Sequence, residues 1–391
     1  MPSNFKLQPE TSISQNRPIA GHSTIDSRIV ILAAVSVFIH AYICGAVALL
    51  ATVYALANPE KRKQILYIPH IRWLAFFAIL TLIVPVVYGN WLGLAVGAAI
   101  IVILIFYLYL CTVMNEGLFN TVADLACIIS LIYFLIALFQ RILGLSPRSP
   151  STFQNANYYS FAMELAMMLF FYRLTTAKTR SHKAFVLFVI AATVAALFMA
   201  DSRSAWPTIF GGLFVYFILN RKMLNLLILI GVYIGGIRLA LSFPAIFPRL
   251  DSFDIAGFIR TNIWLETLNY IKQYPLFGTG AMGFLHLSTV HKFYHSHNLL
   301  LELLVSFGVA GTVFLGAYFM LTFRNMYRVF KLDRKQVIYP LVFAAVTVTA
   351  IHGLVDVTVL WPQTGILLAL MLAGGGVVQP VQPVLSENAT K

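Results

Sequence analysis

Two arginines and one histidine, widely separated in the sequence, have the chemistry needed to hold a phosphate and to deprotonate a hydroxyl. They are Arg203, Arg260 and His297. A guanidinium stays charged and grips phosphate oxygens in a planar fork. A neutral imidazole can take a proton as a general base, which contributes about 10²–10⁴ in rate. We therefore treat the three residues as candidates for one site.

The position of His297 favours a neutral imidazole. It precedes a long apolar run, residues 299–323, and Asn298 can cap the helix expected there. The positive end of a helix dipole disfavours a protonated ring. His295, two residues earlier, is an alternative base or a partner that orients His297. A lone histidine at a membrane interface is more often structural, so the assignment depends on the other residues of the site.

Each arginine also has a simpler interpretation. Arg203 could be an interfacial arginine that reaches water or pairs with Asp201. Arg260 begins an amphipathic segment, residues 258–273, whose apolar spacing predicts a helix on the membrane surface. Trp264 lies four residues later, on the same face, so Arg260 could simply cover an aromatic ring.

Four carboxylates lie in or beside apolar runs, where a charge costs about 2.5–3.5 kcal/mol at mid-membrane. They are Asp124, Glu164, Glu302 and Asp356. Such groups serve function or pair inside the protein. Asp356 lies near an expected outward break between spans, so it is the one we expect to border the site.

A glycine pattern, Gly278-Thr-Gly280-Ala-Met-Gly283, matches a dinucleotide-binding motif only superficially. That motif needs a preceding strand and an acidic residue about 20 positions later, and neither is present. We predict that residues 278–283 form a turn whose backbone closely approaches a lipid or phosphate. The chain also has no Asp-x-Asp pair, P-loop or HExxH motif, so we expect chemistry without a metal or cofactor.

The composition identifies the class of protein. Hydrophobic residues make up 60% of the 391 residues and charged residues 10%, with a mean hydropathy of +0.83. A soluble domain has about 25% charged residues. The formal charge of +13 resides mostly in short loops, so it orients the chain in a membrane and does not indicate nucleic acid.

Hydropathy predicts an all-α polytopic membrane bundle with 11–12 transmembrane helices. The apolar runs are 29–57, 67–88, 91–112, 119–143, 157–174, 183–200, 204–220, 223–242, 298–323, 337–354 and 357–376. The first could be one tilted helix or a pair that breaks near Cys44-Gly45. We divide the chain into a cytoplasmic polar tail (1–28), the bundle (29–376) with one large loop (243–297), and a polar tail (377–391).

The basic residues set the expected orientation. Loops such as 61–63 and 324–335 are dense in lysine and arginine, which places them in the cytoplasm. The alternate connections then face outward. They include the stretch near 146–158, the turn at 201–203, the loop 243–297 and the break near Asp356, so the candidate residues are expected on one face.

Three motifs in this order resemble the O-antigen ligase and polymerase superfamily of bacterial inner membranes. They are Ser202-Arg203-Ser204-Ala205-Trp206, then Arg260-x3-Trp264-x10-Pro275-Leu276-x-Gly278-x-Gly280-x2-Gly283-Phe284, then His295-Ser296-His297-Asn298 with Leu299, Leu300 and Glu302. The resemblance covers residues 185–370. Over the first half of the chain only the hydrophobic character matches.

This resemblance implies a bundle of about a dozen helices with one large periplasmic loop, similar to lipid-dependent glycosyltransferases of the GT-C type. The donor would be a glycan on undecaprenyl diphosphate. Arg203 and Arg260 would bind the diphosphate, and His297 would deprotonate the acceptor hydroxyl. A ligase passes the glycan to lipid A–core, and a polymerase passes it to another lipid-linked unit.

The ligase is favoured over the polymerase because the Arg-x10-Gly pattern of polymerase loops follows neither Arg203 nor Arg260. A transporter or flippase for lipid-linked sugar is the rival from another class. Such proteins often consist of two similar halves, and no internal repeat is visible.

Overall fold

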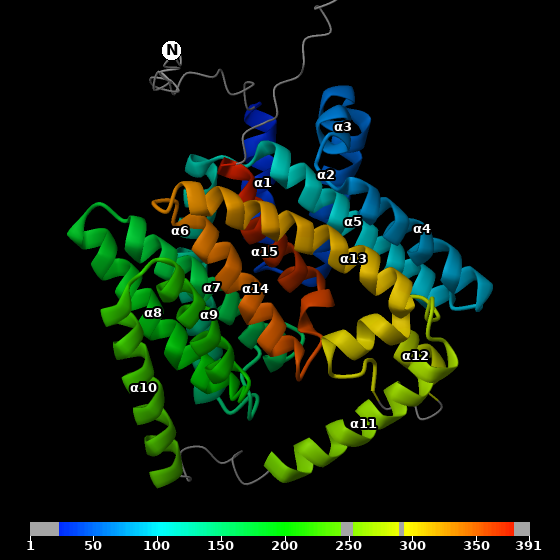
Figure 1. The fold of residues 1–391 in the computed structure, drawn as a ribbon. Coiled ribbons are helices and arrows are strands. Elements are labelled where there is room, and N and C mark those ends of the chain that lie inside the picture. The colour runs from blue at the N-terminus through cyan, green and yellow to red at the C-terminus, as the bar shows by residue number, and fades with distance from the viewer. Residues whose placement is uncertain (1–22, 244–252, 289–292, 379–391) are drawn as a thin grey trace, which may run out of the picture.

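The computed structural model describes residues 23–243, 253–288 and 293–378, and this part of the chain is helical, without strands (Figure 1). Most of the predicted tail 1–28 and nearly all of the tail 377–391 lie outside the described residues, as do parts of the loop 243–297. The predicted all-helical membrane architecture is confirmed.

The helices are, in order, α1 (Thr24–Ser36), α2 (Ala41–Ala57), α3 (Pro59–Leu66), α4 (Ile71–Val87), α5 (Trp91–Val113), α6 (Glu116–Ile142), α7 (Ala156–Thr176), α8 (Arg180–Ala200), α9 (Ala205–Leu219), α10 (Met223–Ser242), α11 (Phe253–Gln273), α12 (Gly283–Leu287), α13 (Leu299–Leu332), α14 (Ile338–Gly353), η2 (Thr358–Leu360), α15 (Pro362–Ala373) and η3 (Gly374–Val378).

Five of the described helices, α5, α6, α8, α10 and α13, are long and apolar enough to cross a membrane. There are six such spans if α2 and α3, bent by 95° relative to each other, count as one. This is fewer than the 11–12 spans that we predicted. Several predicted spans form helices that are too short by this measure, among them α4, α9 and α14.

The first apolar run forms two helices, α1 and α2. The break falls at residues 37–40, and Cys44, where we expected it, is buried inside α2. Helix α1 also starts earlier than predicted, because Ser23 caps it and the buried Asp26 pairs with Lys61 at 2.8 Å. A carboxylate that we had assigned to a polar tail therefore belongs to the bundle.

Helix α7 occupies the centre of the bundle, where most of its side chains are buried and it contacts α6, α8, α9, α14 and α15. Helix α9 packs extensively along α14. Gly211 and Gly212 permit this approach, because a Cβ at either position would collide with Ile351 or Val348. The first residues of α9 are thereby held beside the end of α14.

The glycine turn 278–283 packs against a break in α13. Gly308 has φ of +62°, which interrupts the helix and frees backbone N–H groups, and those of Val309 and Ala310 donate to the carbonyls of Pro275 and Leu276, each at 2.9 Å. In return, Gly280 donates to the Ser306 carbonyl at 2.8 Å. The turn and the break therefore complete each other's hydrogen bonds.

This contact corrects our interpretation of the glycine pattern. A Cβ at Gly278 would lie 2.5 Å from backbone atoms of Ser306, and one at Gly280 would lie 2.5 Å from Pro85. The close backbone approach that we assigned to a lipid or phosphate is thus made to α13 and α4. Gly278 and Gly280 position α11 and α12 under the start of α13 (Figure 1).

Candidate active site

His297 lies immediately before α13, in a backbone conformation fixed by its neighbours. The side chain of Asn298 caps α13 by accepting from the N–H of Leu301 at 3.1 Å, and its amide donates to the Leu354 carbonyl at 3.0 Å. His297 itself has φ of +51°, which is uncommon outside glycine and is often seen at functional sites. The predicted capping role of Asn298 is confirmed.

Glu302 holds the other side of this turn. Its buried carboxylate accepts from the backbone N–H of Ser296 at 2.8 Å and from the hydroxyl of Ser306 at 3.2 Å. It is therefore paired inside the protein, which was one of the two alternatives for this residue. Because it binds the residue preceding His297, it helps to set the direction of the imidazole.

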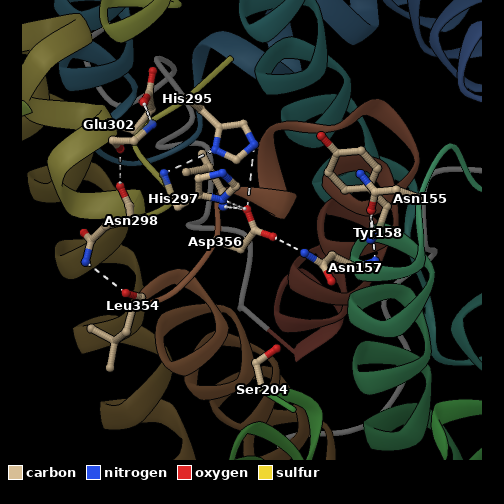
Figure 2. Close-up of polar contacts among 12 residues, drawn as sticks. Asn155, Asn157, Tyr158, Ser204, His295, His297, Asn298, Glu302, Leu354 and Asp356 are labelled. Atoms are coloured by element: carbon tan, nitrogen blue, oxygen red, sulfur yellow. Dashed lines mark hydrogen bonds and ion pairs between the residues drawn. The ribbon is translucent and has the colours of Figure 1, made fainter. Parts of the chain in front are cut away.

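Asp356 meets His297 from the end of α14. Its Oδ1 lies 3.2 Å from Nδ1 of His297 and 3.7 Å from Nε2 of His295 (Figure 2). Burial alone would raise the pKa of Asp356, but the hydrogen bond with His297 and the nearby imidazoles together hold this pKa well below its usual range. Asp356 is thus an anion at neutral pH and orients the ring.

This contact determines which ring nitrogen is available for chemistry. An ionised carboxylate can only accept, so a neutral His297 places its proton on Nδ1. Nε2 is then an acceptor, and no residue in the described part of the chain hydrogen-bonds it. A nitrogen of this kind can take a proton from a hydroxyl.

His295 has a supporting position. Its Nδ1 accepts from the backbone N–H of His297 at 3.3 Å, and the two ring centroids are 4.3 Å apart. The pKa of His295 is lowered to about 4, mainly by burial, with Asp356 opposing this shift and His297 adding to it. Of our two alternatives for His295, the geometry favours the orienting partner.

Two residues that the sequence analysis missed extend this network. Asn157, at the start of α7, donates to Oδ2 of Asp356 at 2.6 Å. Arg148 donates to the side-chain oxygen of Asn157 at 2.6 Å and to the carbonyl of Ala200 at 3.1 Å. Arg148 lies in a loop that we predicted to face outward. Its positive charge on that face is the sequence feature that could have identified it as part of the site.

Arg203 lies in the turn between α8 and α9, at the same end of the bundle. Arg148 donates to the carbonyl of Ala200, the last residue of α8, and thereby links this turn to Asn157 and Asp356. Asp201 takes φ of +48°, and the hydroxyls of Ser202 and Ser204 lie 3.1 Å apart across this turn. Arg203 is half-buried.

Arg260 and Trp264 are both half-buried on α11, which packs along α13. Arg260 is close enough for its charge to act on His352, one turn before Asp356. The indole N–H of Trp264 is buried and has no hydrogen-bond partner in the described residues. The candidate residues therefore gather at one end of the bundle, although the structure describes no direct contact of either Arg203 or Arg260 with His297.

Comparison with known families agrees with the motif resemblance. Residues 186–316 match the family model described as O-antigen ligase. This match supports a place for the chain in the O-antigen ligase and polymerase superfamily. The matched segment runs from α8 into α13 and contains Arg203, Arg260 and His297, whereas Arg148, Asn157 and Asp356 lie outside it. No curated protein matches the chain.

Part of this candidate site has the composition of a metal centre. His295, His297 and Asp356 offer ligand atoms that all lie within 4.8 Å of one another, and two imidazoles with one carboxylate can hold Zn²⁺. Oδ2 of Asp356 already accepts from Asn157, and Oδ1 accepts from the N–H of Val357 at 2.9 Å. Our expectation of metal-independent chemistry therefore needs its own test.

Proposed function

We propose that this protein is an O-antigen ligase, which transfers a glycan from undecaprenyl diphosphate to a sugar hydroxyl of lipid A–core at the periplasmic face of the bacterial inner membrane. The family match supports a membrane enzyme that transfers glycans. The observation that carries the proposal is the His297–Asp356 pair, which leaves Nε2 of His297 open. Membrane lipids surround the site, and no nucleic acid or cofactor takes part.

The reaction breaks the bond between the anomeric carbon and the phosphate oxygen, and it forms a glycosidic bond to the acceptor oxygen. His297 takes the acceptor's proton at Nε2, and the ionised Asp356 stabilises the imidazolium that results. Arg203 and Arg260 neutralise the charge that develops on the leaving diphosphate. Direct displacement inverts the anomeric centre.

The test is transfer by the purified full-length protein in liposomes, with undecaprenyl-diphosphate-linked glycan and lipid A–core. His297→Ala should lower the transfer rate by about 10²–10⁴-fold while donor lipid still binds. The matched control is His286→Ala, because His286 is an exposed histidine on α12. Wild-type transfer by His297→Ala would refute the base assignment.

Three further conditions separate the alternatives. Elongation of the glycan without lipid A–core would indicate an O-antigen polymerase. Movement of lipid-linked glycan across the bilayer without a new glycosidic bond would indicate a flippase. Transfer should persist in a chelator; loss that Zn²⁺ restores would make His295, His297 and Asp356 a metal centre.

A further inference from the structure

A small cavity lies between α11 and α12, close to His297. Its volume is about 230 Å³. Its lining is mainly apolar, from Ile259, Ile263, Phe284 and Phe293, with three polar residues, Asn262, Glu266 and Ser288. This mixture is typical of sites for small polar ligands, which combine apolar walls with a few hydrogen-bonding groups.

The polar wall is built around Glu266. Its Oε1 accepts from the hydroxyl of Tyr270 at 2.6 Å and lies 3.4 Å from that of Ser288. No described residue hydrogen-bonds its Oε2. Glu266 is therefore fixed in place by one oxygen and has the other available to accept from a ligand, while the Asn262 amide beside it can both donate and accept.

The apolar wall leads to the candidate base. Phe293 lines the cavity, and its ring packs edge-to-face on His297 with the centroids 5.8 Å apart. A single phenyl ring thus separates the cavity from the imidazole. A ligand that packs on Phe293 would bring its own polar groups towards His297.

We propose that this cavity binds the pyranose ring that carries the acceptor hydroxyl. A pyranose has C–H faces that pack on aromatic rings and hydroxyls that bind carboxylate and amide groups. This inference rests on the proposed function, because it assigns the cavity to the acceptor of that reaction.

The charge of the cavity distinguishes the acceptor from the donor. Residues 259, 262, 263 and 266 follow helical spacing and present one face of α11 to the cavity, while Arg260 and Trp264 lie on the adjacent face. The negative charge of Glu266 disfavours a diphosphate and suits a neutral sugar hydroxyl. The anionic donor group therefore belongs with Arg260 and the acceptor sugar with Glu266.

The test measures KM for each substrate in the liposome assay, with lipid A–core extracted from a strain that lacks this gene. Glu266→Gln retains an oxygen for Tyr270 but replaces the free acceptor oxygen by a donor. We expect KM for lipid A–core to rise about tenfold, with KM for the lipid-linked donor unchanged. Asn269→Ala, at an exposed position on the same helix, is the control and should behave as wild type.

The other outcomes overturn the proposal in distinct ways. A rise in donor KM alone would place the donor's sugar in the cavity. Unchanged KM values in both Glu266→Gln and Phe293→Leu would show that the cavity binds neither sugar. In either case, transfer that still depends on His297 leaves the proposed function intact, whereas an inactive wild-type protein would refute the function itself.

Discussion

The bundle carries polar clusters at both ends, and the two differ in whether their hydrogen-bonding groups are satisfied. At one end, Arg173 donates to both oxygens of Asp124, at 2.6 and 2.8 Å, and also to Asn120 and Thr176. At the other end, both carboxylate oxygens of Asp356 accept hydrogen bonds. The His297 imidazole that it orients has no partner for Nε2 among the described residues. Asn157 and Arg173 are both on α7, 16 residues apart, which is about 24 Å of helix.

This difference shows that a buried charge does not by itself mark a functional site. The Lys61–Asp26 pair is buried as well, but its two charges lie 2.8 Å apart and neutralise each other, and Tyr109 donates to Asp26 at 2.8 Å. The end with His297 has a positive φ, a broken helix and an unused acceptor nitrogen nearby. Structural strain and open hydrogen-bonding capacity coincide there.

The comparison predicts that substitutions at the saturated end lower stability. Lys61→Ala should cost about 3–5 kcal/mol of unfolding free energy, because it leaves Asp26, of which 1% of the side chain is exposed, buried without its counter-charge. Thermal unfolding in detergent measures this effect. Lys63→Ala, at an exposed neighbouring position, is the control. Equal stability of the two variants would mean that the inner ion pair does not hold the fold.

At the open end, a substitution should affect rate and leave the fold nearly unchanged. Asp356→Asn keeps the shape of the side chain but removes the charge that stabilises a protonated His297. We expect kcat to fall by about 10²-fold, with melting temperature and both KM values near wild type.

The pH–rate profile separates this positioning role from a structural one. Without the carboxylate, the acid limb of the Asp356→Asn profile should move to lower pH, because the imidazolium loses its counter-charge. A lower melting temperature with an unchanged profile would instead place Asp356 with the structural pairs of the opposite end.

A smaller effect is expected at the arginines, where charge can be kept and only geometry changed. Arg203→Lys should reduce transfer about tenfold, since an ammonium cannot bind phosphate oxygens with a planar fork. Arg260→Lys should behave in the same way. Each is measured as kcat/KM for the lipid-linked donor. Wild-type behaviour of both variants would contradict the diphosphate clamp and leave His297 without a bound donor.

Much of this arrangement could be predicted from the sequence. Hydropathy located most of the helices, and the alternation of basic loops placed Arg203, Arg260 and His297 on one face. The break at Gly308 could not be predicted, because it depends on hydrogen bonds from Val309 and Ala310 to residues some 34 positions earlier. Arg148 was missed for a similar reason, since its partners come from α7 and α8.

The weakest expected effect concerns His295, whose contribution to stability depends on pH. Its pKa of about 4 in the folded protein lies below the usual 6.5, so the unfolded chain binds the proton more readily. The stability associated with a neutral His295 is therefore complete above pH 6.5 and lost as the pH falls towards 4. Between pH 7 and pH 5.5 this amounts to about 1 kcal/mol.

His295→Asn should flatten the wild-type stability curve over this interval in chemical unfolding, with His286→Asn as the control for loss of an imidazole. Equal slopes in wild type and His295→Asn would mean that the ring is not kept neutral by burial, and the contrast between the open and saturated ends would then rest on His297 and Asp356 alone.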